Sequence, residues 1–79
     1  MTLEIITPDK KVFSGEATAV TFPGTEGQFQ VLNNHAALVS TLGQGNIIVE
    51  GNTKETFIVD GGVVEVLNNN VLVLAEAIL

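Results

Sequence analysis

Apolar residues in this chain come in short runs separated by turn-forming residues, a pattern typical of β-strands. Between residues 27 and 31 polar and apolar side chains alternate, which places Phe29 and Val31 on the same face of a strand. Residues 35–42 come nearest to a helical period, but the β-branched residues among them disfavour a helix. The pattern predicts strands over residues 3–7, 12–15, 16–22, 27–31, 38–42, 46–50, 55–60, 63–67 and 71–75. So many strands in so short a chain indicate an all-β fold, a small two-sheet β-sandwich of about nine to ten short strands.

Turn-forming residues divide the predicted strands. Pro8-Asp9 favours a turn, and residues 51–54 give a hairpin signal between two strands. Asn68-Asn69 predicts a tight hairpin, since asparagine tolerates a positive φ. Residues 43–45 and the pair Gly61-Gly62 are expected to end the strands that precede them.

The composition indicates a domain that depends on a partner. Hydrophobic residues make up 46% of the 79 positions, charged residues only 15%, and the mean hydropathy is +0.41. A chain of this size buries only about 60–65% of its unfolded surface, so it cannot hide all of this apolar area. Because exposed apolar patches usually mark interaction surfaces, we expect one domain over residues 1–79 that binds another protein.

The charge balance excludes several classes of function. Three basic residues against nine acidic ones give a net charge of −6, which disfavours binding to nucleic acid or to an anionic membrane. The absence of cysteine leaves no disulfide, thiol nucleophile or cysteine-ligated zinc. No signal peptide or membrane-spanning run is apparent, so we expect a soluble domain of intracellular type.

The residues needed for catalysis are mostly missing. His35 is the one histidine, and neither Ser14 nor Ser40 lies in a nucleophile elbow, so a catalytic triad has little support. One histidine with scattered carboxylates also makes a poor metal site, and we expect His35 to be a loop imidazole hydrogen-bonded to the backbone. The glycine-rich residues 24–27 lack the lysine and helix of a phosphate loop. We expect no enzymatic activity, cofactor or metal, and solvated carboxylates at Glu50, Glu55, Asp60 and Glu65.

A carrier domain is an alternative from a different class. Small acidic all-β domains include lipoyl and biotinyl carriers, which present a modified lysine at a hairpin tip. Lys54 lies at such a tip, but the residues usual beside the modified lysine and the two symmetric halves of those domains are not visible here. A solvated turn charge is therefore the simpler interpretation of Lys54.

Several motifs in order make the chain resemble one family. These motifs are VFSGEA at 12–17, VTFPGTEGQFQVLNNHAAL at 20–38, GGVVEV at 61–66 and NVLVLA at 70–75. In this order and spacing, nearly the whole chain resembles the amino-terminal β-sandwich of the epsilon subunit of F-type ATP synthases, a subunit that is called delta in mitochondria. The resemblance implies a non-catalytic central-stalk subunit that rotates with the gamma subunit and the c-ring and helps to couple proton flow to ATP synthesis. It also implies a peripheral position at the cytoplasmic face of the bacterial cell membrane, without direct insertion into lipid.

The resemblance assigns two contact regions. The loop that reaches the c-ring in the family matches Gly24, Thr25, Glu26, Gly27 and Gln28. An acidic residue often stands where this chain has Gln28, so Glu26 would supply the negative charge here, and Gly24 and Gly27 would serve backbone geometry. The region that faces gamma matches His35, Ala36, Leu38, Val39 and Leu42.

The chain departs from the family at two places. The usual Pro-Gly-His-Ala-Pro is replaced at residues 33–37 by NNHAA, which should loosen the loop and requires Asn34 to take any positive φ. Many members continue into a two-helix carboxy-terminal domain that in some species binds ATP. The sequence stops at Leu79, either because the protein is naturally short or because the chain was cut. If the protein is naturally short, we expect the helical hairpin, and ATP binding with it, to be absent.

Overall fold

The computed structural model describes residues 1–79 as β-strands joined by short turns. The strands are β1 (Thr2–Ile6), β2 (Lys11–Glu16), β3 (Ala19–Gly24), β4 (Gly27–Leu32), β5 (Leu38–Glu50), β6 (Lys54–Leu67) and β7 (Asn70–Ala75). None of the elements is a helix with the length and hydropathy needed to cross a membrane. The all-β prediction is confirmed, but seven strands replace the nine to ten expected.

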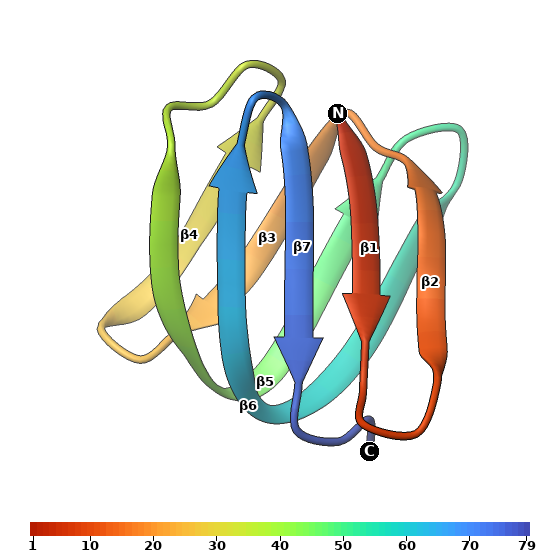
Figure 1. Ribbon diagram of the computed structural model, residues 1–79, viewed down its shortest axis with the longest axis vertical. Coiled ribbons are helices and arrows are strands. Elements are labelled where there is room, and N and C mark those ends of the chain that lie inside the picture. The colour runs from red at the N-terminus through yellow and green to blue at the C-terminus, as the bar shows by residue number, and fades with distance from the viewer.

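The strands form one hydrogen-bonded series that folds over on itself, in the order β2-β1-β7-β6-β5-β3-β4 (Figure 1). Neighbouring strands are antiparallel except for β1 and β7, which run parallel. This parallel pairing places the first and last strands side by side, with Leu3 opposite Val71 and Ile5 opposite Val73, while the two ends of the chain lie at opposite ends of the domain (Figure 1). β2 and β4 are the edge strands of the series.

Two long strands, β5 and β6, pass through both layers of the fold. They curve together at the bottom of the view in Figure 1, so that their halves lie in different layers. One layer holds β2, β1, β7, the second half of β6 and the first half of β5, and the other holds the remaining halves with β3 and β4. The prediction that residues 43–45 and Gly61-Gly62 end strands was wrong. Both strands bend there, and their pairing continues from Leu42 opposite Gly62 to Gln44 opposite Asp60.

The bend changes which side chains of β6 face the core. Val59 is buried before it, and Val64 and Val66 are buried after it, so the buried positions move from odd to even numbers. In a regular strand, side chains that are an even number of positions apart share a face. Val59 and Val64 are an odd number apart yet both face the core, so the strand must depart from regular geometry between them. Gly61 and Gly62 supply this departure with φ values of 98° and 150°, which other residues rarely adopt. In β5 the buried positions likewise change, from even numbers before the bend to odd numbers after it.

The core fills the space between the two layers. Phe22 is its largest fully buried side chain, and its ring centroid lies 5.4 Å from that of Phe29. Phe29 and Val31 both pack toward the core from β4, which confirms their predicted common face. Full burial of one such side chain stabilises the fold by about 1.5–3 kcal/mol. The core residues are Met1, Leu3, Ile5, Ala17, Val20, Phe22, Val31, Leu42, Ile47, Val49, Val59, Val64, Val66, Val71, Val73 and Ala75.

Most of the predicted turns are confirmed. Asn68 and Asn69, at φ 51° and 62°, connect β6 to β7. Residues 7–10 connect β1 to β2, and residues 51–53 connect β5 to β6. The predicted strand over residues 16–22 begins instead at residue 19. Ala17 N–H donates to the Met1 carbonyl at 2.9 Å and Thr18 N–H to the Glu50 carbonyl at 2.8 Å, which separates β2 from β3.

Candidate interaction surfaces

The turn between β3 and β4 presents the residues predicted to contact the c-ring. Gly24 and Gly27 close the turn, while Thr25 and Glu26 form its exposed tip and Gln28 is exposed at the start of β4. Thr25 N–H donates to the Thr41 carbonyl at 3.1 Å, and the two threonine hydroxyls lie 2.8 Å apart. These bonds fix the turn against β5, so its exposed carboxylate projects from a well-supported position.

Both glycines of this turn meet a backbone requirement. A Cβ on Gly24 would lie 2.6 Å from the Gly27 carbonyl oxygen and 2.9 Å from the Phe29 ring. Gly27 has φ 128°. The prediction that these glycines serve backbone geometry is confirmed.

The loop after β4 holds the first residues of the predicted gamma-facing region, and it lies at the opposite end of β4 from the turn (Figure 1). Asn34 adopts φ 63°, as predicted, and its N–H donates to Oδ1 of Asn69 at 2.8 Å. His35 is exposed, its N–H donates to the Leu32 carbonyl at 3.2 Å, and its Nδ1–H donates to the Ala36 carbonyl at 2.8 Å. The prediction of a loop imidazole bonded to the backbone is confirmed.

The first half of β5 divides the remaining gamma-facing residues between two faces. Val39 points outward with 69% of its surface exposed, whereas Leu42 is 4% exposed and belongs to the core. Leu38 is half-buried and packs against the core. Of the residues in the predicted gamma-facing region, Leu42 thus faces the core, because even-numbered residues of this half of β5 face inward.

Val39 belongs to an apolar surface that the sequence did not locate. The register of β5, β6, β7 and β1 places outward-facing side chains side by side, with Val63 opposite Leu74 and Leu74 opposite Ile6. Val39, Leu67 and Leu74 are each more than half exposed. We define the outer apolar face as Ile6, Val39, Val63, Leu67, Leu72 and Leu74.

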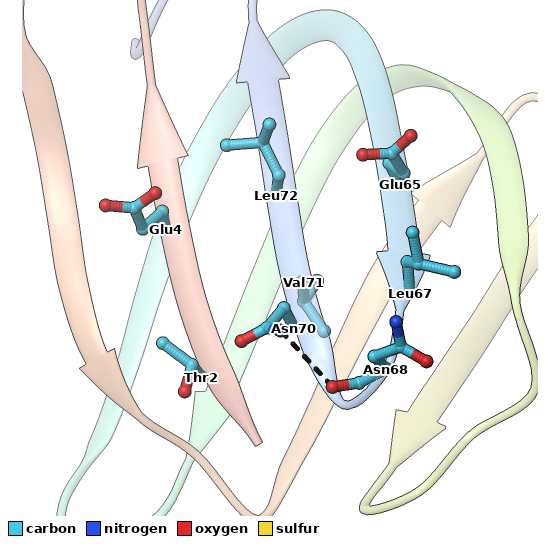
Figure 2. Close-up of a pocket in the computed structure, with 8 residues that line it drawn as sticks. All are labelled: Thr2, Glu4, Glu65, Leu67, Asn68, Asn70, Val71 and Leu72. Atoms are coloured by element: carbon cyan, nitrogen blue, oxygen red, sulfur yellow. Dashed lines mark hydrogen bonds between the residues drawn. The ribbon is translucent and has the colours of Figure 1, made fainter.

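Two carboxylates lie on this face. Figure 2 shows Glu4, Leu72 and Glu65 side by side on β1, β7 and β6, where they help to line a depression of about 340 Å³. Lys11 Nζ lies 3.0 Å from Glu4 Oε2, whereas Glu65 has no ion-pair partner. The face therefore combines exposed apolar side chains with one unpaired negative charge.

Composition indicated this apolar surface but could not place it. Its residues come from strands far apart in sequence, and their alignment depends on the parallel pairing of β1 with β7. The uninterrupted apolar run at 71–75 was the available signal, since a strand with one face in water normally alternates.

Lys54 is exposed at the start of β6 and lies opposite Glu50, beside the hairpin that the sequence predicted. Glu50, Glu55, Asp60 and Glu65 are all exposed, as expected for solvated carboxylates.

Residues 1–79 match the family described as ATP synthase, Delta/Epsilon chain, beta-sandwich domain. The chain is 49% identical over 75 residues to the ATP synthase epsilon chain of Maridesulfovibrio salexigens, covering 94% of this chain and 53% of that one. It is 40% identical over 79 residues to the epsilon chain of Chlorobaculum tepidum, covering 98% and 90%. The chain thus spans little more than half the length of several curated relatives that it matches.

The fold also matches a solved structure of the Euglena gracilis mitochondrial ATP synthase, which contains OSCP, F1 and the c-ring. The TM-score is 0.90 at 25% identity, covering 98% of this chain and 51% of that one. This chain belongs to the delta/epsilon family of ATP synthase chains, and it is their β-sandwich domain that it matches. Nothing in these comparisons supports a lipoyl or biotinyl carrier modified on Lys54.

Proposed function

We propose that this chain is a non-catalytic subunit of the central stalk of a proton-translocating F-type ATP synthase. It turns with the rotor, links the gamma subunit to the c-ring and helps to couple proton flow to ATP synthesis. Support comes from the family match over residues 1–79 combined with an outer face on which apolar side chains are exposed. The chain acts as one β-sandwich unit, peripheral at the cytoplasmic face of a bacterial cell membrane.

The outer apolar face and the adjoining loop form the gamma contact in this proposal. Val39 joins the two, because the loop with His35 and Ala36 leads through Leu38 directly into β5. Burial of these apolar side chains would favour binding, because removing apolar surface from water contributes about 25 cal/mol per Å². Leu42, which lies in the core, supports the strand from behind this contact.

The turn at residues 24–28 forms the c-ring contact. Its tip carries Glu26, which is exposed and has no ion-pair partner in the chain. A pair between exposed charges contributes only about 0–1 kcal/mol, so this contact orients the subunit more than it anchors it.

A co-purification with gamma tests the assignment. We expect the unaltered chain to form a stoichiometric complex and Val39→Asp to lose it, because that substitution places a charge in the apolar contact. Ile58→Asp is the matched control, since Ile58 is 46% exposed but lies in the layer that holds β3 and β4. There it is opposite Asn46 and away from the outer apolar face. Equal loss in both variants, or no complex with the unaltered chain, would contradict the proposal.

A further inference from the structure

Glu65 has apolar side chains of the outer apolar face as its cross-strand and same-strand neighbours, and it also lines a depression with Thr2, Glu4, Asn68 and Asn70 (Figure 2). On the neighbouring strands, Val39 of β5 and Leu72 of β7 lie directly opposite it. Val63 and Leu67 flank it along β6, since residues two positions apart share a face. The carboxylate is exposed and water solvates it in the free chain.

No basic group of the chain neutralises Glu65. Lys11, the basic residue nearest to this face in the register, pairs with Glu4 at 3.0 Å. Lys10 lies in the turn between β1 and β2, and Lys54 lies beside the hairpin between β5 and β6. A protein that covers the outer apolar face therefore covers an unpaired carboxylate.

Covering that carboxylate with a wholly apolar surface is unfavourable. An ionised group removed from water without a partner costs more than the surrounding apolar contacts return, whereas a hydrogen-bonded cation offsets the loss. Arginine suits such a position because its planar guanidinium binds a carboxylate through two parallel hydrogen bonds.

We propose that Glu65 selects the partner of this face: the surface of gamma that docks here is apolar and presents one arginine or lysine to the Glu65 carboxylate. The same charge keeps two copies of the chain apart, because pairing two outer apolar faces would bring two unpaired carboxylates into one apolar contact. This inference rests on the proposed function and adds the chemistry of the partner surface to it.

Titration of gamma with charge variants tests the first part. Glu65→Gln should weaken binding by about tenfold or more, and Glu65→Lys should weaken it further, because the cation on gamma would lose its partner or meet a like charge. Glu4→Gln is the matched control on the same face, since Lys11 already neutralises that carboxylate, and its effect should stay within about threefold. Unchanged unfolding midpoints would show that the variants remain folded.

Sedimentation equilibrium of the chain alone tests the second part. The unaltered chain and Glu4→Gln should be monomeric, and Glu65→Leu should self-associate. Gamma binding that Glu65→Gln leaves unchanged or strengthens would overturn the assigned partner chemistry while the proposed function stands. A Glu65→Leu chain that stays monomeric would overturn the role against self-pairing. Failure of the unaltered chain to bind gamma would overturn the proposed function, and the partner assignment with it.

Discussion

The backbone N–H of Asn34 donates to the side-chain Oδ1 of Asn69, 2.8 Å away and 35 positions later in the chain. Both residues have a positive φ, at 63° and 62°. The bond joins the loop after β4 to the turn between β6 and β7. Each of these segments contains an asparagine with a positive φ, and the bond holds the two segments together. The loop that carries His35 is thereby held beside the outer apolar face.

Glycine substitutions in the β6–β7 turn isolate the energy of this bond. Glycine accepts a positive φ as readily as asparagine, so Asn69→Gly removes the side-chain acceptor without straining the turn. We expect it to lower the free energy of unfolding by about 0.5–1.5 kcal/mol. Asn68→Gly, which leaves Oδ1 of Asn69 in place, should change it by much less. Urea denaturation measures both, and equal losses would show that the bond contributes nothing.

Gly62→Ala should destabilise the fold strongly. A Cβ at Gly62 would collide with the Leu74 carbonyl oxygen and lie 3.0 Å from the Ala75 Cα, at a φ of 150°. We expect a loss of more than about 2 kcal/mol in the free energy of unfolding. At Gly43 the nearest atom to an added Cβ is the Pro23 carbonyl oxygen at 3.9 Å, so Gly43→Ala serves as the control. Similar thermal midpoints for the two variants would argue against a steric requirement at Gly62.

Leu42 and Val39 should respond in opposite ways to truncation. Leu42→Ala leaves a cavity in the core and should cost about 2–5 kcal/mol of stability. Val39→Ala removes an exposed side chain and should change stability by less than about 0.5 kcal/mol, yet weaken gamma binding. Parallel denaturation and binding measurements separate the two roles. A Val39→Ala chain that binds gamma as tightly as the unaltered chain would remove Val39 from the proposed contact.

Glu26→Gln should have a small, salt-dependent effect on binding to the c-ring. An exposed ion pair is worth about 0–1 kcal/mol, which limits the expected weakening to roughly fivefold at low ionic strength. The difference should shrink as salt rises, because exposed charges are screened. Glu55→Gln, a second exposed carboxylate placed beside the β5–β6 hairpin, is the control. Binding to detergent-solubilised c-ring at two salt concentrations provides the comparison.

Local pattern predicted the strands and most turns of this domain, because alternation and turn chemistry act over a few residues. Asn34, Asn68 and Asn69 were predicted to take positive φ values and do so. The predicted strand count differs from the structure at Gly61-Gly62, where β6 bends and continues instead of ending. A glycine pair permits either a chain reversal or a bend, and only the pairing with β5 decides between them.

The candidate contact residues were harder to place than the fold. Leu42 and Val39 lie three positions apart on one strand, and their opposite orientations follow from the phase of β5 relative to the core. The outer apolar face depends on pairing between segments as distant as Ile6 and Leu74. Pairing between such distant segments cannot be predicted from the pattern of a few neighbouring residues. The excess of apolar residues indicated only that some apolar face must stay exposed to solvent.

The passage of β5 and β6 through both layers has a mechanical consequence. Their main chains tie the layers together covalently, so one layer cannot slide over the other without unbending two strands and rupturing their ladder. A load applied at the Gly24–Gly27 turn reaches β5 through its bonds to Thr41 and is shared by both layers. Shear between the two layers is therefore opposed by the main chains of both strands as well as by the packing of the core.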